Sequence, residues 1–380
     1  MAEKIRVVII DDSLMFRTFL QRVLVTDEAI DIVGVFADPV EAMEKIPQIR
    51  PNVMTVDMEM PKMRGNEFLR NVLPRNPGVN AVVISALSGN VFDAMQAGAI
   101  DFVGKPNSQP GYTNEVFRED IIGKIKAAAT VRRRISAADV SRGTATSPAQ
   151  TSPALGRTGA GSRTLHDIAQ GVPLKQAASG AVFSGPLATT SRSIVAIGAS
   201  TGGTEAILQV IQGFPENMPG VVIVQHMPPG FTRMYAERAE RLCRMTVREA
   251  QNRDKVEQGL ILIAPGGSEQ CRVVQSGGGY SVELREGPKV SGHCPSVDVL
   301  FESIAAAAGS KAVGVLLTGM GADGAQSLKL MRNAGAHTIG QDEATCVVYG
   351  MPKVAYDIGG VAEQLPLGSI GSAVIRQFSK

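Results

Sequence analysis

Short apolar runs alternate with amphipathic segments over the first third of the chain. The segments between the runs, such as residues 14–23, carry apolar residues at helical spacing. Runs without apolar–polar alternation are typical of strands buried on both faces, and intervening helices join such strands in parallel. The pattern predicts an α/β domain with a five-stranded parallel sheet, its strands at residues 5–10, 32–36, 53–56, 82–84 and 100–103.

The last half of the chain repeats this alternation with one interruption. Residues 272–275 and 280–284 flank a Ser-Gly-Gly-Gly turn and predict an antiparallel hairpin. The other runs indicate a doubly wound, mostly parallel, Rossmann-like sheet, with strands at residues 194–199, 221–224, 260–264, 312–317 and 337–340.

Between these two parts the composition changes sharply. From about Ser136 to Arg192 the chain is rich in Ser, Thr, Ala, Gly and Pro, with little hydrophobic periodicity. Such a composition is typical of a flexible linker. We therefore predict a first domain at 1–134, a linker at 135–192 and a second domain at 193–380.

Charge and composition exclude several classes of function. The formal net charge is +2 and tryptophan is absent, so neither a general attraction to nucleic acid nor a base-stacking platform is expected. The four cysteines are scattered without a C-x-x-C pair, which argues against a zinc cage or a disulfide framework. No apolar run approaches a membrane span and no signal peptide is recognisable. We expect a cytoplasmic protein without membrane insertion.

Acidic residues stand at strand ends of the first domain. Asp11 and Asp12 follow its first strand and Asp57 ends the third, and this fold brings those strand ends together. Crowded carboxylates repel one another unless a hard cation such as Mg²⁺ neutralises them. Ser85 and Lys105 lie at the same edge. Each acid alone would more often be a cap or a solvated strand end, but together they suit an aspartate, Asp57, that accepts a phosphoryl group.

Residues 5–130 resemble a response-regulator receiver domain of the flavodoxin-like class. The shared motifs are Asp-Asp-Ser at 11–13, Val-Asp-Met-Glu-Met-Pro at 56–61, Ile-Ser-Ala at 84–86 and Phe-Val-Gly-Lys-Pro at 102–106. The resemblance implies that Asp57 is the phosphoacceptor and that a histidine kinase is the donor. It further implies that Asp11, Asp12, Asp57 and the Glu59 backbone are Mg²⁺ ligands. Ser85 and Phe102 would be the switch residues, and Lys105 would contact the phosphate.

In the second domain, the turn at residues 198–203, Gly-Ala-Ser-Thr-Gly-Gly, joins a buried strand to a helix. A turn of this kind lies at the carboxyl edge of a parallel sheet, where ligands bind and helix N–H groups stabilise negative charge. From the turn alone, a phosphate or nucleotide loop and a serine nucleophile both remain open. The flanks of Ser200 differ from the G-x-S-x-G elbow of the common hydrolases.

Two further polar residues follow strands of the second domain. His226 comes after the strand at 221–224, and Asp323 follows the strand at 312–317. With Ser200 they supply a nucleophile, a base and an orienting carboxylate. The amides of Met320 and Thr201 are the candidate oxyanion donors. Asp323 could instead be the N-cap of the helix that follows it.

His226 is the best candidate base among four histidines. His166 falls in the predicted linker, and His293 and His337 lack so clear a strand-end setting. A lone histidine is often only structural, but two glycine-rich turns carrying the other candidate residues favour the catalytic interpretation.

Residues 193–360 resemble the catalytic domain of the chemotaxis protein-glutamate methylesterases. The shared motifs are Gly-Ala-Ser-Thr-Gly-Gly at 198–203, Gln-His-Met-Pro at 225–228, Pro-Ser-Val-Asp at 295–298 and Leu-Thr-Gly-Met-Gly-Ala-Asp-Gly at 317–324. The resemblance implies a Ser200–His226–Asp323 triad, without a cofactor, that hydrolyses glutamate methyl esters and deamidates glutamines on methyl-accepting chemoreceptors.

The order of the domains predicts control by phosphorylation. A tethered receiver stays at high local concentration near the catalytic edge, where it would obstruct substrate until Asp57 is phosphorylated. One alternative is a receiver-controlled binding module without catalysis. A DNA-binding response regulator is weaker, because no helix-turn-helix or basic recognition helix is evident.

Overall fold

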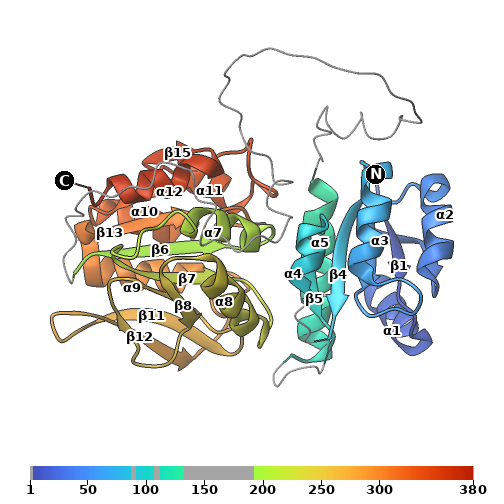
Figure 1. Cartoon of the computed structure of the whole chain (residues 1–380), viewed down its shortest axis with the longest axis horizontal. Coiled ribbons are helices and arrows are strands. Elements are labelled where there is room, and N and C mark those ends of the chain that lie inside the picture. Colours follow the sequence, from blue (N-terminus) through green and yellow to red (C-terminus); the bar gives the residue numbers. More distant parts are fainter. Residues whose placement is uncertain (1–2, 87–90, 107–111, 132–191, 380) are drawn as a thin grey trace, which may run out of the picture.

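In the computed structural model, two α/β domains lie side by side (Figure 1). The structure describes residues 3–86, 91–106, 112–131 and 192–379. The predicted linker, residues 135–192, lies outside the described residues apart from Arg192. Within these ranges, no helix has both the length and the apolar character needed to cross a bilayer.

The first domain is a five-stranded sheet in the order β2-β1-β3-β4-β5, with every neighbouring pair parallel. This confirms the predicted parallel sheet. Its strands are β1 Ile5–Ile10, β2 Ile30–Phe36, β3 Val53–Asp57, β4 Asn80–Ser85 and β5 Asp101–Gly104. Its helices are α1 Leu14–Leu24, α2 Pro39–Ile49, α3 Gly65–Val72, α4 Val91–Gln96 and α5 Asn114–Thr130. Apolar clusters fill both faces, as an apolar strand such as β1 requires.

The second domain contains a seven-stranded parallel sheet in the order β15-β14-β13-β6-β7-β10-β8. Its strands are β6 Ile194–Ala199, β7 Gly220–Gln225, β8 Thr246–Glu249, β10 Leu260–Ile263, β13 Ala312–Leu316, β14 His337–Gln341 and β15 Glu363–Leu365. Its helices are α7 Gly203–Ile211, α8 Phe231–Leu242, α9 Val297–Ala308, α10 Ala325–Asn333, α11 Met351–Asp357 and α12 Leu367–Arg376.

The predicted antiparallel hairpin is also present. Strands β11 Glu269–Ser276 and β12 Gly279–Glu286 pair in register, and β9 Lys255–Val256 adds a third strand to this small sheet. The fold class predicted for the second domain is therefore confirmed.

Strand β6 determines where a ligand can bind in the second domain. It lies between β13 and β7, so the chain leaves β6 toward β7 and later returns to its other side at β13. Ligands of doubly wound sheets bind at such a switch point, outside the carboxyl ends of the strands. The residues that follow β6, β7 and β13 thus converge at one edge.

The domains contact each other through β5, α4 and α5 of the first and α8 of the second (Figure 1). The rings of Phe102 and Phe231 lie 4.9 Å apart between centroids, and those of Phe92 and Tyr235 lie 5.7 Å apart. At the rim, Lys289 Nζ is 2.6 Å from Glu119 Oε2. The contact therefore has an aromatic centre and a charged edge.

Candidate active site and phosphorylation site

The turn after β6 holds Ser200 at the rim of a cavity. The Ser200 N–H donates to the Thr318 carbonyl at 3.0 Å, and Gln225 Nε2 donates to the Ser200 carbonyl at 2.9 Å. A Cβ on Gly203 would lie 2.0 Å from Gln225 Oε1, so only glycine allows this close approach. The backbone of Ser200 is thus tied to both neighbouring strands.

Asp323 is a buried carboxylate held by four donors. His226 Nε2 lies 2.8 Å from its Oδ2, and Ser296 Oγ donates to Oδ1 at 2.6 Å. The amides of Val297 and Asp298, in the first turn of α9, donate at 2.8 and 2.9 Å. Burial raises the pKa of Asp323, but these hydrogen bonds outweigh burial and hold the pKa below its usual value. The carboxylate therefore stays charged beside the imidazole.

The alternative interpretation of Asp323 as the N-cap of the helix after it is wrong. The N-cap of α10 is Gly324, and no side chain caps that helix. The Asp323 side chain points instead to the first turn of α9, where exposed N–H groups favour an anion.

Ser200 and His226 line the same cavity of about 860 Å³. His226 Nδ1 is buried and has no hydrogen-bond partner in the part of the chain that the structure describes. No hydrogen bond between Ser200 Oγ and His226 is present there either. The structure thus contains the His226–Asp323 pair, together with an imidazole nitrogen that remains open to accept a proton.

The two candidate oxyanion donors lie on the wall of this cavity. Thr201 is buried, whereas the Met320 side chain is 42% exposed. Across the described ranges, neither backbone N–H has an acceptor. Open amides are what an oxyanion site requires, and the role of Met320 and Thr201 stays a prediction.

The sequence analysis set aside a histidine that belongs to this site. The ring of His293 stacks on His226 with centroids 3.6 Å apart and planes 11° from parallel. Its sequence position gave one signal, because it stands three residues before Ser296, the N-cap of α9 that also holds Asp323. Gln225, which holds the carbonyl of Ser200, was missed as well.

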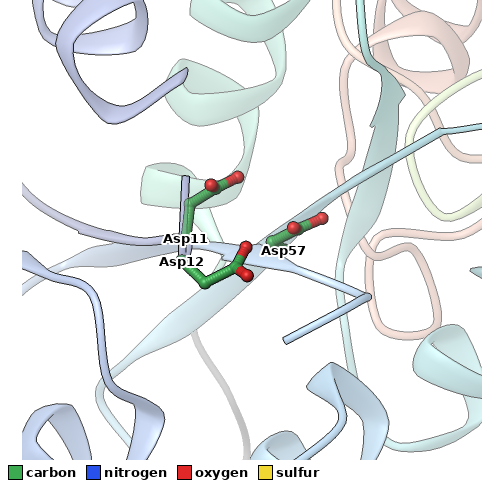
Figure 2. Close-up of side chains that lie close together, drawn as sticks. All are labelled: Asp11, Asp12 and Asp57. Atoms are coloured by element: carbon green, nitrogen blue, oxygen red, sulfur yellow. The ribbon is translucent and has the colours of Figure 1, made fainter. Parts of the chain in front are cut away.

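At the carboxyl edge of the first domain, Asp11, Asp12 and Asp57 each offer an oxygen within 4.8 Å of the others (Figure 2). Lys105 Nζ lies 2.9 Å from Asp57 Oδ2 and 3.3 Å from Asp11 Oδ2. Burial raises the pKa of Asp57 to about 6, although Lys105 opposes this shift. The cluster therefore carries more negative charge than one lysine can balance.

This oxygen set fits a magnesium ion. Asp11 Oδ2 is buried and receives no hydrogen bond within the described ranges, although Lys105 lies nearby. The Glu59 N–H hydrogen-bonds to the Asp57 carboxylate, which places this backbone beside the cluster, and the role of the Glu59 backbone as a magnesium ligand stays a prediction. Mg²⁺ prefers such oxygens and leaves room for phosphate oxygens.

The two predicted switch residues lie on neighbouring strands: Ser85 ends β4, and Phe102 lies within β5. Ser85 is fully buried and its Oγ donates to the Ala86 carbonyl at 2.5 Å. Phe102 is 1% exposed and its ring packs on Phe231 of the second domain. One predicted switch position therefore forms part of the contact between the domains.

Both domains match known families. Residues 195–374 match the CheB methylesterase family, and residues 7–116 match the response regulator receiver domain. A relative from Syntrophomonas wolfei, named protein-glutamate methylesterase/protein-glutamine glutaminase 2, is 47% identical over 99% of this chain and 98% of its own length. A relative from Syntrophotalea carbinolica, named protein-glutamate methylesterase/protein-glutamine glutaminase, is 43% identical over 100% of this chain and 99% of its own length. The crystal structure of the Thermotoga maritima CheB methylesterase catalytic domain is 36% identical, with a TM-score of 0.48, over 49% of this chain and 98% of that chain.

Proposed function

The chain belongs to the CheB methylesterase family, and on this premise we propose that Ser200, His226 and Asp323 are the catalytic triad of a protein-glutamate methylesterase and protein-glutamine glutaminase. One observation carries the proposal. His226 Nε2 is hydrogen-bonded to the Asp323 carboxylate at 2.8 Å, while His226 Nδ1 has no hydrogen-bond partner among the described residues, and His226 and Ser200 line one cavity.

In the proposed reaction, Ser200 Oγ attacks the carbonyl carbon of a glutamate methyl ester while His226 Nδ1 takes the hydroxyl proton. The Met320 and Thr201 amides stabilise the oxyanion. The imidazolium then returns the proton to the leaving group, and methanol departs from the acyl-enzyme. Water, deprotonated by the same nitrogen, releases glutamate and restores Ser200. A glutamine side chain follows the same course with ammonia as the leaving group.

The proposed substrates are methyl-accepting chemoreceptors, in the adaptation step of chemotaxis. The phosphodonor is a chemotaxis histidine kinase, which implies a cytoplasmic location. The Asp57 carboxylate attacks the phosphorus, and the donor departs. Asp11, Asp12, Asp57 and the Glu59 backbone would hold Mg²⁺, which when bound screens the charge of the incoming phosphoryl group.

The regulation that we propose follows from what closes the cavity. Its wall includes Glu119 and Lys124 from α5 of the receiver domain beside Ser200 and His226. A receiver in this position obstructs a receptor segment, and phosphorylation of Asp57 weakens the contact and admits the substrate. The boundaries 1–134, 135–192 and 193–380 remain our proposal for the domains and the linker.

The test of the triad is methanol release from methylated receptors, with the full chain and a small phosphodonor. Ser200→Ala should lower the rate at least about 10³-fold, because the nucleophile is lost. Ser268→Ala is the matched control, since this exposed serine lines the same cavity. Near wild-type release by Ser200→Ala would overturn the triad, and no release by the phosphorylated wild-type chain would favour a binding module instead.

The test of regulation compares phosphorylated and unphosphorylated chains. Asp57→Asn should keep the basal rate and lose its increase with phosphodonor, because no acyl phosphate can form. Removing residues 1–135 should raise the rate above that of the unphosphorylated full chain. A truncated chain no faster than the unphosphorylated full chain would contradict obstruction.

A further inference from the structure

Among the described residues, the His226 ring makes a single hydrogen bond. Its Nε2 binds Asp323, but a single hydrogen bond leaves the ring free to rock about that contact. The parallel ring of His293, at 3.6 Å, covers one whole face and removes this freedom. With Nε2 and the ring plane both fixed, the direction of Nδ1 is fixed as well.

His293 is itself held on the frame that holds the carboxylate. Its N–H and carbonyl exchange two hydrogen bonds of 2.9 Å with Val290. Gln270 Nε2 donates to the His293 carbonyl at 3.3 Å, while Gln270 Oε1 accepts from the Ser296 N–H at 2.9 Å. Ser296 in turn donates to Asp323. The stacked ring and the orienting carboxylate therefore share one support.

The charge state of His293 suits this position. Burial lowers the pKa of His293, and the adjacent His226 lowers it further. Lys289 and Lys124 act in the same direction, while Asp323 opposes them. His293 consequently stays neutral when His226 takes a proton, and a neutral π face does not repel the imidazolium that forms.

We propose that His293 is a positioning residue for the esterase reaction: its neutral ring, stacked on His226, fixes the plane of the base and shields it from water. This inference rests on the proposed function. It assigns His293 no contact with the substrate and no proton transfer of its own. What matters is a flat ring at this place, and a nitrogen in that ring is not required.

The test uses the phosphorylated full chain, methylated receptors and methanol release. His293→Ala should lower kcat about 10- to 100-fold with little change in KM, because the base loses its alignment. His293→Phe restores a flat ring and should recover kcat to within about fivefold of wild type.

His337→Ala is the matched control, because this half-buried histidine pairs with Glu363 at 3.2 Å, away from the cavity. It should leave kcat and KM unchanged. A wild-type kcat in His293→Ala would overturn the inference. So would a rise confined to KM, which indicates substrate contact, or a His293→Phe variant as slow as His293→Ala, which indicates a need for the nitrogens. Activity in Ser200→Ala, by contrast, would refute the proposed function itself.

Discussion

Asp57 and Asp323 both lie at the carboxyl edge of a parallel sheet, yet their environments differ. Asp57 ends β3 and Asp323 lies in the turn between β13 and α10, and each is nearly inaccessible, at 3% and 1% exposure. Burial favours the neutral form of both. The pKa of Asp57 is accordingly raised to about 6, whereas the pKa of Asp323 is lowered despite burial.

The difference lies in the number and origin of the hydrogen-bond donors. Asp323 receives bonds from His226, Ser296 and two amides at the start of α9. Asp57 is paired with Lys105 but lies beside two further carboxylates. The folded chain thus supplies all four hydrogen bonds that keep the Asp323 carboxylate charged. The site around Asp57 carries more negative charge than Lys105 balances, which fits the cation and the phosphoryl group proposed for it.

The largest expected effect is on catalysis. Asp323→Asn should lower kcat for methanol release about 10³- to 10⁴-fold, because an amide cannot hold the same His226 tautomer or stabilise the imidazolium. Asp298→Asn is the control, since the Asp298 side chain contacts Ser291 and Ser327 and not His226. A loss below tenfold in Asp323→Asn would show that the carboxylate does not orient the base.

The second effect is on stability, and substitution of Asp57 and of Asp323 should change the free energy of unfolding in opposite directions. Because the pKa of Asp57 is raised on folding, its ionisation destabilises the native state above about pH 6. Asp57→Asn should therefore increase the free energy of unfolding of the receiver domain by about 1–3 kcal/mol at pH 8. This gain should shrink toward pH 4, where the native carboxyl is protonated. Domain-resolved hydrogen exchange across this pH range measures it.

Asp323→Asn should do the reverse and destabilise the second domain by about 2–3 kcal/mol, because hydrogen bonds to a charged group are lost. The pKa of Asp323 is lowered on folding, so its contribution is fully present above the ordinary carboxyl pKa and fades only below it. The loss should thus be constant from pH 5 to pH 8. Changes of the same sign in both variants would refute the comparison.

Magnesium provides a third effect, similar in size to the second. Mg²⁺ at about 100 times its dissociation constant should stabilise the receiver domain by about 2.7 kcal/mol. The gain should fall below pH 6, since protons compete for Asp57. Calorimetry with and without a chelator measures it. Asp57→Asn should lose most of this gain in stability, and Asp323→Asn should retain it. Equal gains in both variants would show that Mg²⁺ does not bind at Asp57, the last residue of β3.

The smallest effect concerns the rim of the domain contact. Glu119→Lys should raise the unphosphorylated rate by up to about fivefold, because an exposed ion pair contributes at most about 1 kcal/mol and here becomes a repulsion. Glu119→Lys combined with Lys289→Glu should return the rate toward wild type, and high salt should reduce both changes. A double variant as fast as the single one would exclude this pair from docking.

The sequence predicted those parts of the molecule that have strong local patterns. The apolar runs of β1 and β6 identify buried parallel strands, and the acids after β1 and β3 identify one edge of a sheet. The hairpin was predicted for the same reason, because its strands flank a glycine-rich turn. Resemblance supplied the roles of Glu59 and Phe102, which no spacing reveals.

Other features depend on context that a local pattern lacks. Strands β8 and β15 were missed because they are short and only partly buried. His293 was missed because the ring on which it stacks lies 67 positions earlier in the chain, His226.

The contact between Phe102 and Phe231 has a consequence for the receptor. Phe102 is a predicted switch residue of the receiver domain and Phe231 belongs to the methylesterase domain, so the proposed regulation couples the conformational equilibria of the two domains through this contact. Thermodynamic linkage is reciprocal. If phosphorylation weakens the contact between the domains, then a receptor that binds the separated domains must stabilise the phosphorylated form over the unphosphorylated form to the same extent. Receptor binding would thus favour the phosphorylated, active state of the enzyme that acts on the receptor.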